Sequence, residues 1–252
     1  MTTIYEPSRT ISSRISRRLT RYVSRRMAKV KLDRPIVSVT FDDCPLSAID
    51  NGVKLLEKEG WHSTIYVSGG LMGTTNHHGL HIKISDCLEL EKTGHEIAGH
   101  TYSHIDAQQY SLSHYLKDMD RNRRLFEGAG LKPFETFAYP YGQTTPGLKS
   151  ALSKKFLGLR GIEPGAHADQ VDLNQVKSFP AFSGATLEAA VSKIKALEKD
   201  PAWITIFTHD IRDNHSPWGC SPNDMKRLVQ AIKESGAEVM TVAGAIKKLR
   251  AA

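Results

Sequence analysis

The sequence predicts an α/β fold in which parallel strands alternate with helices. From residue 35 onward, short runs rich in β-branched and aromatic residues alternate with longer segments of helical periodicity, as in βαβ units. The chain has 252 residues, 40% of them hydrophobic, and its composition does not change after residue 35. This is enough apolar material for one large core. We therefore expect a single domain over residues 35–252, preceded by an N-terminal arm at 1–34.

Each predicted element has a local cause. The first strand is an apolar run, and the helix after it carries Val53, Leu55 and Leu56 and closes at Gly60. Glycines also follow the helices that end near residues 92 and 127. We expect strands at residues 37–41, 63–68, 95–98, 135–138, 156–161, 203–207 and 237–242, and helices at 48–59, 85–92, 112–127, 186–197, 222–234 and from 243 onward.

A long loop rich in glycine and histidine, residues 69–81, follows the second strand. Loops at the carboxyl ends of parallel strands build active sites, so we expect this loop to line a substrate groove. It contains His77, His78 and His81, which would suit a second metal site. Loop histidines without a spacing pattern are more often exposed, and we expect these three to face solvent.

Basic residues are concentrated in the arm. Residues 1–31 carry nine basic side chains and one acid, a formal charge of +8, whereas the whole chain has +7, so the remaining body is close to neutral. Apolar residues recur every three to four positions between residues 11 and 30, which predicts an amphipathic helix. Such a helix suits an anionic membrane surface, with contact through residues 9–31. A helix packed on its own domain and a partly disordered tail are equally open alternatives.

The cysteines and the N-terminus indicate the compartment. Cys44, Cys87 and Cys220 are odd in number and lack metal-type spacing, which favours a reducing environment. No stretch approaches the ~18 apolar residues of a membrane span, and the N-terminus lacks the apolar core of a secretory signal. We expect a cytoplasmic protein. An organelle transit peptide, which is also rich in Arg and Ser, is the alternative.

Two adjacent carboxylates, Asp42 and Asp43, end the first strand. Neighbouring anions repel and are costly to bury, so a cation or a shared proton must relieve them. His100 and His104 follow the strand at 95–98, and histidines four apart lie on one face of a helical turn, where both can reach one divalent metal. With Asp43 as the third ligand, Asp42 stays free to act as a general base.

At these residues the chain resembles the polysaccharide deacetylases, carbohydrate esterase family 4, which share the NodB homology domain. The residues Thr-Phe-Asp-Asp at 40–43 and His-Thr-Tyr-Ser-His at 100–104 are similar to the family's first two motifs. Tyr-Pro-Tyr-Gly at 139–142 and Phe-Thr-His-Asp at 207–210 follow in the family's order, so the resemblance covers roughly residues 35–250. It implies a distorted (β/α) barrel of about seven parallel strands.

The resemblance also implies a role for each matching residue. A divalent metal, zinc first with cobalt, nickel or manganese as alternatives, would be held by one carboxylate and two imidazoles. The metal ligands would be Asp43, His100 and His104, the general base Asp42, the proton donor to the leaving nitrogen His209, and the oxyanion donor the backbone amide of Tyr141.

The chain departs from the family pattern at two positions. Ala138 stands where the family has an arginine that orients the catalytic aspartate, and Arg160, in the next predicted strand, could supply that cation instead. Phe207 takes the place of a leucine two residues before His209, which would change the shape of the acyl pocket. The family's fourth motif is not assigned among the nearest residues, Asp169, Asp172 and 179–182.

The implied activity is hydrolysis of N-acetyl groups on N-acetylglucosamine-type residues of a glycan. An enzyme kept in the cytoplasm is similar to the cytosolic deacetylases of exopolysaccharide synthesis, such as holdfast, a biofilm adhesive. The arm would then hold it at the inner membrane face near a lipid-linked precursor, and no nucleic acid is expected as a partner. The alternatives are a metal-dependent amidase or deformylase acting on a small or lipid-linked amide, and a non-catalytic relative that binds an acidic polymer.

Overall fold

The computed structural model describes residues 10–251, and strand β2 (Ile36–Asp42) lies at the centre of the fold. All seven residues of β2 are buried. They are buried because β11 (Trp203–Thr208) pairs along one edge, while β3 (Thr64–Val67) and β12 (Glu238–Val239) pair along the other. A parallel strand enclosed in this way reads as a continuous apolar run, which is the signal that predicted it.

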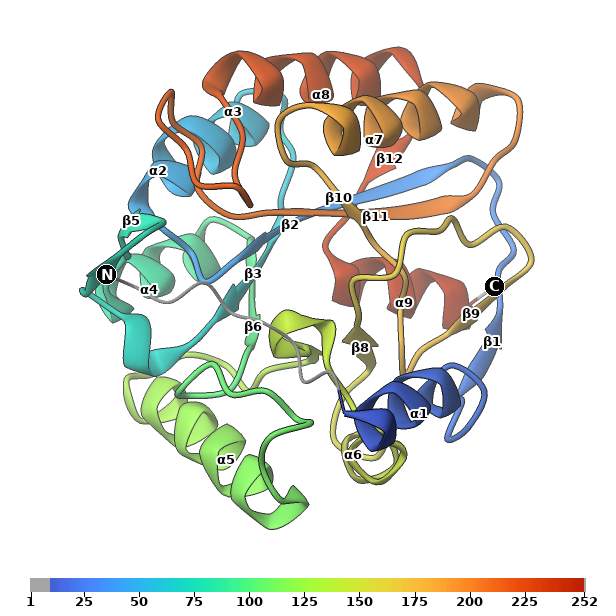
Figure 1. The fold of residues 1–252 in the computed structure, drawn as a ribbon. Helices are drawn as coiled ribbons and strands as arrows, with labels where there is room; N and C mark the ends of the chain where they lie inside the picture. The colour runs from blue at the N-terminus through green and yellow to red at the C-terminus, as the bar shows by residue number, and fades with distance from the viewer. Residues whose placement is uncertain (1–9, 252) are drawn as a thin grey trace.

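The main sheet curls into a half-barrel of parallel strands (Figure 1). Its path is β10-β11-β2-β3-β6-β7-β8, with β12 paired to β2 off this path, and every pairing is parallel. An isolated bridge between Arg160 and Val176 joins the end of β8 to the chain just before β10. The remaining strands of this sheet are β6 (Glu96–Gly99), β7 (Thr136–Ala138), β8 (Gly158–Arg160) and β10 (Phe179–Pro180).

Helices cover the outer surface of the half-barrel (Figure 1). Helices α7 (Ala185–Lys195) and α8 (Pro222–Glu234) pack side by side next to β10, β11 and β2. The other helices are α1 (Ile11–Thr20), α2 (Leu46–Ala48), α3 (Lys54–Glu57), α4 (Ile84–Lys92), α5 (Leu112–Gly128), α6 (Pro146–Leu152) and α9 (Val242–Ala251), with a π-turn at Ile49–Val53 and 3-10 turns at Gly69–Leu71, Pro140–Gly142 and Ala196–Glu198.

From residue 35 onward the predicted strands and helices are present, two of them changed in extent, whereas helix α6 and strand β10 were not predicted. The helix expected at 48–59 is divided by the π-turn into α2 and α3. The strand expected at 237–242 is reduced to β12, and α9 begins at Val242. Two antiparallel pairings were not predicted: the hairpin of β4 (Thr75–Asn76) with β5 (Gly79–Leu80), and the pairing of β1 (Met27–Lys29) with the distant β9 (Gln170–Asp172).

The arm packs on the domain rather than forming one long helix. The predicted helical pattern is wrong beyond Thr20, because α1 ends there and β1 pairs with β9. The buried Lys149 amino group donates hydrogen bonds to the Thr20 carbonyl at 2.7 Å and to Asp172 at 3.0 Å. Residues 1–9 of the predicted arm lie outside the described residues.

Hydrogen bonds from Arg26 join the arm to the rest of the domain. Its guanidinium donates to four backbone carbonyl oxygens, those of Ser153, Phe156, Leu157 and Leu173, at 2.6–3.4 Å. Val30 enters a hydrophobic cluster with residues of β2 and α9. Among residues 10–251, no helix has the length and apolar character needed to cross a bilayer, and the three cysteines are free and buried.

Candidate active site

The predicted site residues all follow strands that end at one edge of the half-barrel. Asp42 is the last residue of β2, His100 follows β6, and His209 follows β11. Carboxyl ends of parallel strands meet at one edge, and a cavity of about 560 Å³ opens there. It is lined by the predicted residues Asp42, Asp43, His100, His104, Tyr141 and His209, together with Tyr139, His78, Phe182, Phe207 and Trp218.

Asp43 and the two predicted histidine ligands converge. The Asp43 Oδ1 atom lies 3.4 Å from His104 Nε2 and 3.8 Å from His100 Nε2, and the three donor atoms are within 4.8 Å of one another. Asp43 Oδ1 is buried without a hydrogen-bond partner. His100 Nδ1 donates to the Ala138 carbonyl oxygen at 2.8 Å, which leaves Nε2 as the free lone pair. An orphaned carboxylate oxygen facing two imidazoles fits a divalent cation.

The protonation states of this group suit metal ligation. Burial raises the pKa of Asp43, whereas the neighbouring His104 and His100 lower it. The resulting pKa is well below the usual range. Burial, followed by the nearby His104, lowers the pKa of His100 to about 4. At neutral pH the carboxylate is therefore ionised and the His100 imidazole is neutral, as metal ligands must be.

A loop, and not the predicted helical turn, brings His100 and His104 together. The chain between them has no helix, and both Thr101 and His104 have a positive φ, of 59° and 51°. The Asp118 carboxylate on α5 holds the loop by accepting from the backbone N–H groups of Tyr102 and Ser103 at 2.8 and 2.9 Å. The prediction that both imidazoles reach Asp43 is confirmed, while the helical reason for it was wrong.

Asp42 has a partner on one carboxylate oxygen and none on the other. Its Oδ2 atom pairs with Arg160 Nη2, while its Oδ1 atom is buried without a hydrogen-bond partner. The Arg160 guanidinium is fully buried and lies 4.9 Å from the Tyr66 ring centre and 5.0 Å from that of Phe207. One carboxylate oxygen is thus paired, the other has no partner, and the residue is part of the cavity lining.

Arg160 brings a cation to Asp42 from the strand beside Ala138. Ala138 and Arg160 are register partners on the adjacent strands β7 and β8. The Ala138 side chain is fully buried in a cluster with Tyr66 and Ala98. The prediction that Arg160 reaches the aspartate from a neighbouring strand is confirmed as a contact.

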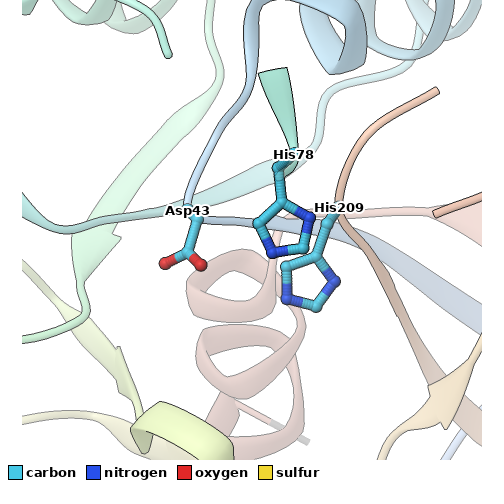
Figure 2. Close-up of side chains that lie close together, drawn as sticks. All are labelled: Asp43, His78 and His209. Carbon is cyan, nitrogen blue, oxygen red and sulfur yellow. The ribbon is translucent and has the colours of Figure 1, made fainter. Parts of the chain in front are cut away.

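His209 lies against His78, a residue that we expected to be exposed to solvent. His209 Nδ1 donates to the Trp218 carbonyl oxygen at 3.1 Å, and its ring stacks on that of His78 with centroids 4.7 Å apart and planes 9° apart (Figure 2). His78 and His81 are 4% and 1% exposed, so the expectation of exposure is wrong for both. It is right for His77.

The β4–β5 hairpin places His78 beside the segment of Asp210 and Ser216 that buries it. The hairpin turns residues 77 and 78 toward the cavity. Asn76 and Gly79 at the ends of its turn are typical turn residues, and they are the sequence signal that could have predicted the hairpin. Asn76 Oδ1 accepts from the His78 backbone N–H at 2.7 Å, and Gly79 has a φ of 99°, which suits glycine.

Tyr141 forms part of the opposite wall. Its backbone is in the left-handed region with φ 56°, inside the 3-10 turn after β7. Its ring packs edge-on against the His104 ring, with the two ring centroids 4.4 Å apart. Burial, followed by the charge of Asp43, raises the pKa of Tyr141 to about 12, so the phenol is neutral at pH 7. Phe182, Phe207 and Trp218 complete the aromatic lining.

Solved structures share this fold. The Xyl-CE4 domain of a multidomain xylanase from the hindgut metagenome of Trinervitermes trinervoides superposes with a TM-score of 0.62 at 17% identity, covering 86% of this chain and 91% of that one. The chitin deacetylase of Colletotrichum lindemuthianum gives a TM-score of 0.62 at 15% identity, covering 86% and 89%. These likenesses confirm the predicted NodB-type α/β architecture.

Sequence comparison identifies the family. The Bacillus subtilis (strain 168) protein YxkH, whose name assigns it to the polysaccharide deacetylases, is 26% identical over 163 residues, which cover 63% of this chain. The match spans 57% of that relative's length. The family model for polysaccharide deacetylases matches residues 29–161, just over half of the sequence. The chain belongs to the polysaccharide deacetylase family, as its four ordered motifs predicted.

Proposed function

We propose that this protein is a metal-dependent N-deacetylase that removes acetyl groups from N-acetylglucosamine-type residues of a glycan. The observation that carries the proposal is the convergence of Asp43, His100 and His104 beside Asp42, which keeps one oxygen unpartnered. The reaction breaks the amide C–N bond by addition of water and releases acetate and a free amine on the sugar.

The three converging residues would hold the metal. A bound divalent ion, zinc first among the candidates, would polarise the amide carbonyl and make an attacking water more acidic. Asp42 takes the proton of that water at Oδ1, while Arg160 keeps Oδ2 occupied and fixes the carboxylate plane. The family pattern assigns the backbone amide of Tyr141 to the developing oxyanion.

His209 supplies the proton without which the amine cannot leave. Its Nδ1–H is donated to the Trp218 carbonyl, so the proton for the amine must be carried on Nε2 of the doubly protonated ring, which becomes the neutral Nδ1–H tautomer when the amine leaves. His209 lines the same cavity as Asp42. One residue therefore accepts a proton and another delivers one within a single cavity, which is the requirement of acid–base hydrolysis.

The cavity favours a sugar as substrate. Phe182, Phe207, Trp218 and Tyr141 present aromatic surface beside the polar residues, and pyranose rings bind by combining apolar faces with a few polar contacts. We propose an exopolysaccharide such as holdfast, or its lipid-linked precursor, as the physiological glycan. Release of acetate from N-acetylglucosamine oligomers, rather than formate from a formylated amide, distinguishes this activity from a deformylase.

The exposed side chains of the arm support our proposal that the protein lies in the cytoplasm at the inner face of the membrane. Ile15, Leu19 and Tyr22 are 52%, 48% and 75% exposed and recur at helical spacing along α1 and just past its end. Arg18 is exposed on the same segment. Exposed apolar side chains next to arginine suit the boundary of an anionic bilayer.

We expect Asp42→Asn to bind metal normally and to lose most turnover, since the amide cannot accept the proton of the attacking water. The rate should fall by about 10²- to 10⁴-fold. His104→Ala should lose both metal and turnover because a ligand is removed. Acetate release and bound zinc, measured on the same samples, check both expectations, with His114→Gln at an exposed position as the control. Near-normal turnover in Asp42→Asn would refute the assignment of the base.

We expect Arg160→Met to lower kcat by about ten- to a hundredfold with zinc content retained, because Asp42 loses the partner that orients it. Arg160→Lys should recover part of the loss, since it restores the charge without the planar guanidinium. Lys149→Met is the matched control, because it removes a fully buried cation paired with Asp172 outside the cavity. A kcat for Arg160→Met equal to that of the control would remove Arg160 from the mechanism.

We expect the triple variant Arg18→Glu, Leu19→Ser, Tyr22→Ser to sediment with anionic lipid vesicles at least about tenfold less than the wild type. These positions are exposed, whereas deletion of residues 1–31 would also remove β1 and Arg26. Lys226→Glu, at an exposed position of α8, changes the charge by the same amount as Arg18→Glu and should bind like the wild type. Equal sedimentation of all three proteins would refute the membrane role of α1.

A further inference from the structure

The proposed proton donor His209 is held by a hydrogen bond at one edge and by a ring on one face. Its Nδ1–H is donated to the Trp218 carbonyl oxygen at 3.1 Å. Its face lies on His78, with ring centroids 4.7 Å apart and planes 9° apart (Figure 2). Phe182 and Phe207 are farther away, at 5.9 and 6.4 Å between centroids, and their planes are tilted by 49° and 71°. The last side-chain torsion of histidine has only a broad preference, so the flat contact with His78 is what limits the tilt of the ring.

Polar contacts hold His78 itself in place. Its Nδ1 atom lies 3.2 Å from Asp210 Oδ1 and 3.0 Å from Ser216 Oγ, and the residue is 4% exposed. Asp210 is fully buried, and its Oδ2 atom accepts from the Ser216 backbone N–H at 2.8 Å and from Arg212 Nε at 2.9 Å. Apolar packing of the hairpin would bury a ring here but would not require these polar partners. The position of the His78 ring is therefore specified by hydrogen bonds.

Ser216 joins the two groups that hold His209. Its hydroxyl donates to Asp210 Oδ1 at 2.6 Å and accepts from the Trp218 backbone N–H at 3.2 Å, and it also contacts His78 Nδ1. Trp218, whose carbonyl holds one edge of His209, and His78, which holds its face, thus share one anchor. Asp210 is also the next residue after His209 in the chain. These contacts form one connected network around the His209 ring, so the loss of one member weakens the hold of the others.

We propose that His78 is a positioning residue for His209, held in this role by Asp210 and Ser216. The proposal rests on the proposed function, in which His209 delivers a proton to the leaving nitrogen. Such a transfer needs the donor atom within hydrogen-bond reach of that nitrogen, and a displacement of about 1 Å can lower the rate about a hundredfold. His78 acts through His209 alone. Its loss therefore slows reactions whose leaving group must be protonated, and it spares the attack of water on the carbonyl, which depends on Asp42.

The activity test compares two leaving groups. It measures kcat for N-acetylglucosamine oligomers, whose amine leaves only after protonation, and for p-nitrophenyl acetate, whose phenolate leaves as an anion. His78→Leu should lower the ratio of the amide kcat to the ester kcat by about tenfold, because the proton donor is no longer aligned. His78→Asn should recover part of this loss, since its side-chain N–H can donate to Asp210. Ser216→Ala should lower the ratio in the same direction, so the test stands if one variant fails to fold.

The matched control is His81→Leu. His81 is a buried histidine next to the same hairpin, with its Nδ1 atom 3.1 Å from the Thr74 carbonyl oxygen, and its loss should leave the ratio as in the wild type. A ratio unchanged in both His78→Leu and Ser216→Ala, while His209→Gln lowers it, would overturn the proposal. No acetate release from the oligomers by the wild type, or an unchanged ratio in His209→Gln, would instead contradict the proposed function.

The second measurement is independent of activity. Nitrogen-15 spectra of the His209 ring, recorded in mildly alkaline buffer, report which ring nitrogen carries the hydrogen. The wild type and His81→Leu should show hydrogen on Nδ1, as the bond to Trp218 requires, whereas His78→Leu and Ser216→Ala should show a mixture of both neutral forms. A His209 that keeps the Nδ1–H form alone in both variants, or lacks it in the wild type, would overturn the proposal.

Discussion

The structure depends on the neutralisation of two adjacent carboxylates at the end of its central, fully buried strand. Asp42 and Asp43 are each 4% exposed, and an unpaired ion at such a position costs several kcal/mol. The fold divides the two charges between different partners. Arg160 pairs with Asp42, whereas imidazoles surround Asp43. This division gives two neighbouring residues of the same type two different environments, and our proposed function assigns them two different roles.

The strand order explains how both partners arrive. Because the sheet curls, β8 faces the end of β2 across the half-barrel, and Arg160 can reach Asp42 through the interior. The family's usual arginine would come from the adjacent strand position, where this chain has Ala138. With a small residue at 138 and a cation at 160, the charge balance is kept. The cation comes from β8 instead of β7. Asp42 therefore keeps a cationic partner although position 138 does not carry one.

The sequence predicted the fold and the candidate site best where the polar site residues lie in short motifs. The run that ends on Asp42 and Asp43, and the histidines at 100 and 104, predicted both the central strand and the converging ligands. Spacing alone could not distinguish a helical turn from the loop that Asp118 holds, because both bring residues four apart to one side. His78 was missed because its burial depends on Asp210 and Ser216, which are more than 130 residues away. The arm was misread beyond Thr20 because β1 is stabilised by pairing with β9, a distant segment.

The most direct test of this account is an anomalous difference map from crystals of the protein loaded with one equivalent of zinc. The account predicts a peak in contact with the Asp43 carboxylate and with Nε2 of His100 and His104, and no bond from the ion to Asp42. A map without a peak among these three residues, or with the zinc bound to Asp42 instead, would contradict the division of roles between the two carboxylates.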